Sequence, residues 1–318
     1  MLPPTWPTQS MPSIGHLVRD PASVPQVIAN YWRDVSTLPS EVEQPAAVKQ
    51  QAQAAVLEAL QAHPRQLPAA EAQGELGRPE VPSIAVARAL RATPHGKAPG
   101  RNGLPADLYT VFSRQFSPSL ATLYTAIGTT GTMPARFTDG IITVLFKKGV
   151  PTEPGNYRPI TLLNTDYRNL AKVLTTRLGP ALHAAIAAKQ TAFLPCCLIG
   201  TNIFALRHVL HLLKRQGWSA IIAFLDFAKA YDTVHRHLLL VAMAELGGTE
   251  LLQKWVCTLL SATQAQAQVG GRLSQPVSMA AGVRQGCPLA PLLVAQTLLP
   301  WLRRKGMVYG WTPPMRST

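Results

Sequence analysis

The spacing of apolar and polar residues predicts helices and strands mixed along one chain. Strand-like runs, rich in β-branched and aromatic residues, occupy residues 141–148 and 220–225. Residues 265–279 read as two strands joined at Gly270 and Gly271, which is a hairpin signal. Helical spacing recurs in six segments, residues 27–35, 46–62, 82–92, 167–188, 203–213 and 234–246. Gly179 and Pro180 predict a break within the segment 167–188.

Proline and weak patterning set the N-terminal part of the chain apart. Residues 1–45 are dotted with proline, and residues 66–82 have the composition of a linker. We therefore expect a helix-rich and partly disordered N-terminal extension over residues 1–81. The main α+β body is expected over residues 82–318, with ample apolar material for a core.

One carboxylate stands at a position suited to chemistry. The apolar run 220–225 predicts a buried strand, and Asp226 follows at its exposed end. A carboxylate there is a natural ligand for Mg²⁺, and the alternative is a surface aspartate that caps the next helix. Asp232 precedes the helical pattern of residues 234–246, so it fits the role of an N-cap better than Asp226 does.

Positive charge is concentrated in the main body. Residues 1–80 hold five Lys or Arg and eight Asp or Glu, whereas residues 81–318 hold 25 and eight, out of a net charge of +14. Such an excess suits a polyanionic partner, with salt-dependent binding through phosphate contacts. The alternative is a basic domain that is merely soluble.

Cysteine spacing and hydropathy favour an intracellular protein. The four cysteines form no pair with zinc-ligand spacing, which favours a reduced compartment. The first ten residues do not have the pattern of a signal peptide. The longest uncharged apolar stretch, residues 288–302, has 15 residues with three prolines, fewer than the roughly 20 of a membrane helix. We therefore expect no membrane association.

Five motifs resemble those of one family in the family's own order. GKAPGRNGLP at 96–105 is similar to a basic segment that opens the domain of this family. IITVLFKK at 141–148 is similar to a strand that ends in two lysines, and NYRPITLLN at 156–164 is similar to the strand that pairs with it. LDFAKAYDTV at 225–234 and GVRQGCPLAP at 282–291 resemble the first catalytic-carboxylate motif and the Arg-Gln-Gly-Cys-Pro motif. By these motifs the chain is identified as a reverse transcriptase domain of the non-LTR (LINE-type) retrotransposons.

The resemblance implies a fingers and partial palm fold and template-directed nucleotide addition. Asp226 would bind two Mg²⁺ ions, with Mn²⁺ as a possible substitute, and the backbone carbonyl of Phe227 would complete one shell. The partners implied are an RNA template, a DNA primer and dNTPs. The resemblance also implies contacts with the substrates. Lys147, Lys148 and Arg158 would contact the triphosphate, and Tyr231 would contact the sugar. Gln285 and Gly286 would lie against the nascent base pair, and Lys97 and Arg284 would contact the nucleic acid.

The sequence also departs from the family pattern. Residues 251–318 contain no Asp or Glu, so the Phe/Tyr-x-Asp-Asp pair that completes the two-metal site is missing. Cys196, Cys197 and Thr201 replace a Gly-Arg pair and an Asp. We expect a domain truncated before that motif, which does not polymerise alone. Two interpretations stay open: a fragment of an RNA-directed DNA polymerase, or a catalytically dead remnant that only binds RNA or DNA. Either would be intracellular, in the nucleus or cytoplasm.

Overall fold

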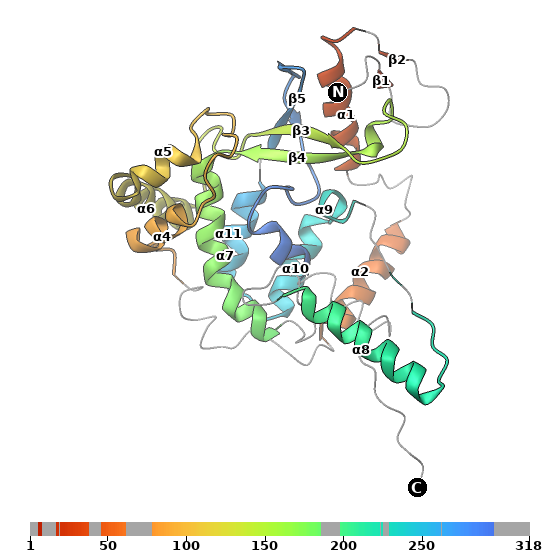
Figure 1. Cartoon of the computed structure of the whole chain (residues 1–318). Helices are drawn as coiled ribbons and strands as arrows, with labels where there is room; N and C mark the ends of the chain where they lie inside the picture. Colours follow the sequence, from red (N-terminus) through yellow and green to blue (C-terminus); the bar gives the residue numbers. More distant parts are fainter. Residues whose placement is uncertain are drawn as a thin grey trace.

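The computed structural model describes residues 6–7, 17–18, 20–37, 46–61, 78–185, 198–222, 224, 229–261 and 263–295. Helices surround a small sheet (Figure 1), which confirms the expected mixture of α and β structure. The helices are α1 (Val24–Val35), α2 (Ala46–Gln61), α4 (Ser83–Arg91), α5 (Ala106–Val111), α6 (Ser113–Thr130), α7 (Thr165–Ala185), α8 (Gly200–Gln216), α9 (Ala230–Thr233), α10 (Arg236–Glu245) and α11 (Glu250–Leu260). The strands are β1 (Trp6–Pro7), β2 (Leu17–Val18), β3 (Gly140–Phe146), β4 (Tyr157–Leu163), β5 (Gln264–Val269), β6 (Arg272–Leu273) and β7 (Val277–Ser278).

The main sheet brings two distant parts of the chain together. Its strand order is β4, β3, β5, β6, and β7 pairs with β5. The β3–β4 pair is antiparallel, with Gly140 opposite Leu163 and Phe146 opposite Tyr157. β5 pairs with β3 in parallel, although strand β4 and the helices α7 to α11 lie between the two strands in sequence. The β5–β6 hairpin turns at Gly270 and Gly271, as the sequence predicts.

The larger core is helical and draws on α4, α6, α7, α10 and α11. The predicted break in α7 is wrong, because the helix runs without interruption from Thr165 to Ala185. Proline inside a helix costs about 3 kcal/mol. Leu170, Leu174 and Leu178 are buried along one face of α7, and each such leucine contributes about 1.5–3 kcal/mol. Core burial therefore outweighs the local helix breaker.

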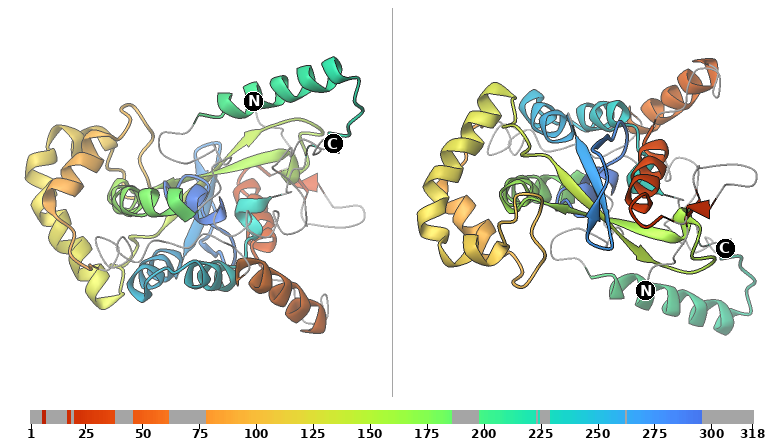
Figure 2. Two further views of the ribbon diagram at one scale, coloured as in Figure 1. Left: turned by 90° about the horizontal axis from the view of Figure 1, so that it is seen from below. Right: turned by 90° about the horizontal axis from the view of Figure 1, so that it is seen from above.

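A second core joins α1 to the sheet. Val24, Ile28 and Trp32 of α1 pack with Ile142 of β3 and Ala267 of β5, among other residues. Viewed from above, α1 lies beside the crossing of β5 with the β3–β4 pair (Figure 2). Helix α1, which the sequence assigned to an N-terminal extension, is thus built into the same body as the sheet.

The predicted buried strand at residues 220–225 is not present in its described part. Residues 220–222 and 224 have no strand pairing, and the side chains of Ile221 and Phe224 are 99% and 83% exposed. A strand needs a partner for its N–H and C=O groups, and none of the described strands pairs with this segment. The other predicted strands and helices are present with small shifts at their ends. Among the described residues, no helix is long and apolar enough to cross a membrane.

Candidate functional site

A cavity of about 600 Å³ lies where β3, β4, α9 and the loop after β7 meet. Five of the side chains or backbone positions singled out in the sequence line it, and they come from segments far apart in the chain. The lining includes Lys147, Arg158, Lys229, Tyr231, Asp232, Gln285 and Gly286. Three cations and one carboxylate therefore face a single space.

The pairing of β3 with β4 explains why two of the cations share this space. Arg158 is directly opposite Leu145, and the next pair is Phe146 with Tyr157. The N–H of Lys147 donates to the carbonyl of Asn156 at 2.9 Å, which extends the ladder by one residue. Because side chains alternate between the two faces of a strand, Lys147 lies on the same face as Leu145 and Arg158. Lys148 follows in a bend beyond the ladder. Lys148 is not among the residues that line the cavity.

Residues 282–286, which we call the glycine loop, fasten α9 to β4. The N–H groups of Gly282 and Val283 donate to the carbonyls of Val234 and Tyr231, at 2.8 and 2.7 Å. On the other side, the N–H of Thr161 donates to the carbonyl of Gln285 at 2.8 Å. These backbone bonds hold Tyr231 and Gln285 in the lining of one cavity.

Gly286 has a structural reason to be glycine. Its φ of 130° lies outside the range that other residues adopt, and a Cβ at this position would collide with the carbonyl oxygen of Thr161. The absence of a side chain at Gly286 therefore allows the glycine backbone to approach strand β4 closely.

Asp232 was predicted to be the N-cap of the helix over residues 234–246, and this prediction is wrong. It lies within α9 and does not cap α10, whose N-cap is His235. The side-chain amide of Gln285 donates to both of its carboxylate oxygens, at 2.8 and 3.1 Å. Burial raises the pKa of Asp232 to about 6, against smaller opposing effects of Gln285, Lys229 and Lys147. Asp232 directly follows Tyr231 within the motif 225–234, and this position could have identified it in the sequence as a residue of the same site.

Arg284, for which the resemblance implies a contact with nucleic acid, lies in the interior of the structure. Its side chain is buried, donates to the carbonyl oxygen of Thr138, and lies 5.5 Å from the ring centroid of Tyr167. Burial lowers the pKa of this guanidinium. Within the Arg-Gln-Gly-Cys-Pro motif, arginine therefore holds the glycine loop to the interior, and glutamine faces the cavity.

A second arginine, the partly buried Arg236, was not singled out from the sequence. Its guanidinium donates to the carbonyls of Leu260, Ala281 and Gly282 and to the hydroxyl of Thr263, over 2.7–3.2 Å. It thereby connects α10, the end of α11 and the glycine loop. Burial lowers its pKa to about 10, with a further contribution from Arg284.

The remaining predicted residues lie outside this cavity or outside the described residues. Lys97 is exposed in the loop of residues 96–105, which docks on the end of β4 through a bond of 3.1 Å from the N–H of Asn102 to Asn164. Asp226 and Phe227 fall outside the described residues, so their roles stay predictions. Among the described residues there is no group of three His, Cys, Asp or Glu side chains that could hold a metal ion.

Comparison with known proteins decides the family. The family model described as "Reverse transcriptase (RNA-dependent DNA polymerase)" matches residues 146–305. The chain belongs to this family. The matched region of this reverse transcriptase chain includes every described residue that lines the cavity except Trp32.

The similar proteins confirm the resemblance to LINE-type retrotransposons. The "Transposon TX1 uncharacterized 149 kDa protein" of Xenopus laevis is 31% identical over 218 residues, which cover 68% of this chain and 17% of the relative. A "Retrovirus-related Pol polyprotein from type-1 retrotransposable element R2" is 24% identical over 200 residues in Nasonia vitripennis (63% and 19% covered). A protein of the same description in Popillia japonica is 30% identical over 164 residues (51% and 23% covered). The reverse transcriptase chain thus spans about a fifth of the length of these relatives.

Proposed function

We propose that this chain is the part of an RNA-directed DNA polymerase that holds a deoxynucleoside triphosphate against an RNA template and a DNA primer. The observation that carries the proposal is the convergence of Lys147, Arg158, Tyr231 and Gln285 on one cavity. A chance cluster of surface cations would not also bring an aromatic ring and an amide to the same space. In this assignment the β3–β4 pair belongs to the fingers, and α9 with the glycine loop belongs to the partial palm.

Each side chain has a chemical task in this proposal. The planar guanidinium of Arg158 binds phosphate oxygens in pairs, and the ammonium of Lys147 adds a point charge on the same face of the β3–β4 pair. Tyr231 contacts the sugar and excludes a 2′-hydroxyl. Gln285 lies against the base pair that is being formed, held in place by Asp232.

The divalent ion enters the proposal only through residues outside the described part of the chain. In the described lining of the cavity Asp232 is the one carboxylate, and both of its oxygens accept N–H groups from Gln285. That arrangement does not form a site for two ions. Asp226 and the carbonyl of Phe227 are the proposed ligands for Mg²⁺ or Mn²⁺, and such an ion would supply charge stabilisation during phosphoryl transfer.

We expect the 318-residue polypeptide to bind dNTPs and not to extend a primer. Residues 251–318 supply no Asp or Glu that could complete a two-metal site. The test is primer extension on an RNA template with Mg²⁺ or Mn²⁺, beside equilibrium binding of dATP. Extension that disappears in Asp226→Ala would contradict the expected inactivity and establish the chain as a polymerase on its own.

Binding of dATP distinguishes the proposed pocket from a general attraction of phosphate to a basic protein. Arg158→Met and Lys147→Met should each weaken dATP binding about tenfold, the effect of one charge-assisted hydrogen bond. Lys214→Met is the matched control, because this lysine of α8 is exposed and does not line the cavity. Equal losses for all three variants would show that only overall charge matters.

The charge of the main body supports a second candidate function, which is binding of RNA or DNA without chemistry. Residues 81–318 carry 25 Lys or Arg and eight Asp or Glu. Binding of an RNA oligonucleotide that weakens with salt, without any binding of dATP, would favour this candidate. The proposal includes an intracellular location, in the nucleus or cytoplasm.

A further inference from the structure

Helix α1 lies outside the region that matches the family model, yet it reaches the cavity. The match begins at residue 146, and Trp32 of α1 lines the same space as Arg158 and Gln285. The side chain of Trp32 is buried at 3% exposure, so its position in the wall is fixed by the second core.

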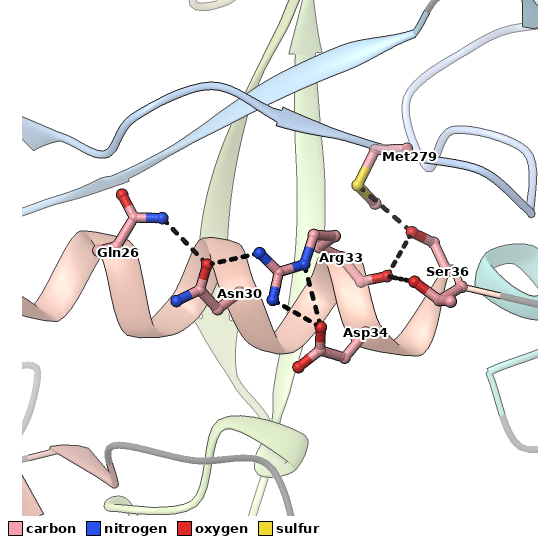
Figure 3. Close-up of polar contacts among 7 residues, drawn as sticks. Gln26, Asn30, Arg33, Asp34, Ser36 and Met279 are labelled. Atoms are coloured by element: carbon pink, nitrogen blue, oxygen red, sulfur yellow. Dashed lines mark hydrogen bonds and ion pairs between the residues drawn. The ribbon is translucent and has the colours of Figure 1, made fainter.

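Contacts at both ends fasten α1 to the segment that leads into the glycine loop. At the start, the side-chain oxygen of Gln26 accepts the N–H of Gln275 at 2.9 Å. At the end, the carbonyl of Ser36 accepts the N–H of Ala281 at 2.6 Å, and its hydroxyl lies 3.5 Å from the sulfur of Met279. Figure 3 shows Ser36 turned toward Met279, while Asn30 and Arg33 interact along the helix. The helix therefore has a defined position relative to the cavity.

From this position α1 presents two aromatic rings to Lys229. The ammonium nitrogen of Lys229 donates to the hydroxyl of Tyr31 at 2.6 Å and lies 4.7 Å from the centroid of that ring. It also lies 5.7 Å from the ring centroid of Trp32, and the two rings are packed edge to face. The hydrogen bond to the Tyr31 hydroxyl and the cation–π attraction of the Trp32 ring together restrain an otherwise flexible side chain.

Tyr31 connects both walls of the cavity. Besides Lys229 on one side, its hydroxyl approaches Gly155, in the turn before β4, where a Cβ would lie only 2.8 Å from the hydroxyl oxygen. The turn is three residues before Arg158. Tyr31 thus lies between Lys229 and the β3–β4 pair, which carries Lys147 and Arg158.

The backbone of Lys229 is also held in an unusual conformation. Its φ of 53° is left-handed, and among the described residues other than glycine only Arg136 shares a positive φ. Its carbonyl accepts the N–H groups of Asp232 and Thr233, at 2.8 and 3.1 Å, as the first acceptor of α9. Such a conformation persists only where the surroundings determine it, and it is characteristic of functional sites.

We propose that Lys229 binds phosphate oxygens of the nucleotide in this cavity and that Tyr31 and Trp32 of α1 hold it there. An ammonium has three donors, of which Tyr31 receives one, so donors remain for a ligand. With Lys147 and Arg158, Lys229 forms a three-cation lining that matches a triphosphate. Helix α1 is then a part of the nucleotide pocket. The inference rests on the proposed function and adds a binding residue and two positioning residues to it.

The experiment measures equilibrium binding of dATP, dAMP and a single-stranded RNA oligonucleotide to the full chain. Lys229→Met should weaken dATP binding about tenfold and leave dAMP nearly unchanged, because the lost contact is to the outer phosphates. Lys229→Arg should retain most of the affinity, since a guanidinium both stacks on aromatic rings and binds phosphate. Tyr31→Phe keeps the ring and removes the hydroxyl, and about a threefold loss is expected. Lys214→Met in α8 serves as the matched control, because this exposed lysine does not line the cavity.

The outcomes separate this inference from the proposed function. If the unaltered chain binds dATP and Lys229→Met binds it equally well, the inference is overturned and the pocket remains. If the unaltered chain binds no dATP, both fall together. A loss confined to the RNA oligonucleotide would assign Lys229 to the nucleic-acid backbone and overturn its role toward the nucleotide. Should Lys229→Met unfold, as judged by circular dichroism, an unchanged affinity in Tyr31→Phe overturns the inference instead.

Discussion

Gln285 donates its side-chain amide to both carboxylate oxygens of Asp232, at 2.8 and 3.1 Å, although 53 residues separate the two in sequence. The bond joins the glycine loop to α9 across the wall of the candidate nucleotide pocket. It orients the amide of Gln285, and among the described residues this partly buried carboxylate forms no salt bridge with a lysine or arginine.

Asp232→Asn should stabilise the folded chain at pH 7 by roughly 1–3 kcal/mol and have little effect at pH 4. Burial raises the pKa of Asp232 from 3.8 to about 6. Between these values the folded chain holds a proton that the unfolded chain has lost, so stability from this group decreases as the pH rises through the window. The free energy of unfolding in urea, measured from pH 4 to pH 7.5, checks this.

Asp107 provides a contrast of opposite sign within the same protein. His95 and the N–H of Gly96 lower its pKa, so its contribution to stability is lost as the pH falls. Asp107→Asn should therefore lose nothing at low pH and lower the stability at neutral pH. Parallel pH trends for Asp107→Asn and Asp232→Asn would rule out burial as the cause at Asp232.

Gly286→Ala should lower the free energy of unfolding by about 2–4 kcal/mol. The added methyl group meets the carbonyl oxygen of Thr161, and the φ of 130° is strained for alanine. Gly200→Ala is the control, because a Cβ at Gly200 has no heavy atom within 4 Å and alanine is the better helix former. Chemical denaturation of both variants measures the difference, and equal stability would contradict the close approach at β4.

Arg236→Met should destabilise the fold by about 3–5 kcal/mol, because it leaves three carbonyls and a hydroxyl without their donor. Arg33→Met is the comparison, since Arg33 pairs with Asp34 at the surface, where both side chains are more than 40% exposed. Exposed pairs contribute at most about 1 kcal/mol. Thermal unfolding should therefore separate the two variants clearly, and a small shift for Arg236→Met would show that the glycine loop holds without it.

Arg284→Lys should lower stability by about 1–3 kcal/mol and leave the salt dependence of RNA binding unchanged. The buried guanidinium contacts Thr138 and Tyr167, so it is not available to phosphate. Lys97 is exposed, and Lys97→Gln should reduce the slope of log K against log salt by about 0.7–0.9 if it contacts one phosphate. A reduced slope in Arg284→Lys would return this residue to the binding surface.

Local structure followed from the sequence where short-range patterns decide it. Strand β3, the β5–β6 hairpin and helices α1, α2, α8 and α10 appear where apolar spacing, turn residues and glycine predict them. The pairing of β3 with β4 is the one that the family resemblance implies. Helix α7 was predicted to break because Pro180 is a strong local signal, and the burial of Leu174 and Leu178 outweighs it. The strand expected at residues 220–225 fails in its described part for a related reason, since strand formation depends on a partner that sequence pattern does not reveal.

The sequence by itself determined the family and most of the residues around the cavity, because motif order and residue type carry that information. Only the tertiary structure decided which side chains share a space. Pairing of β3 with β4 places Lys147 on the same face as Arg158, whereas Lys148 does not line the cavity. Packing of the glycine loop buries Arg284 and places the side chain of Gln285 against Asp232. Packing of α1 on the sheet brings Tyr31 to Lys229. These arrangements depend on long-range hydrogen bonds and burial, which no local spacing along the chain specifies.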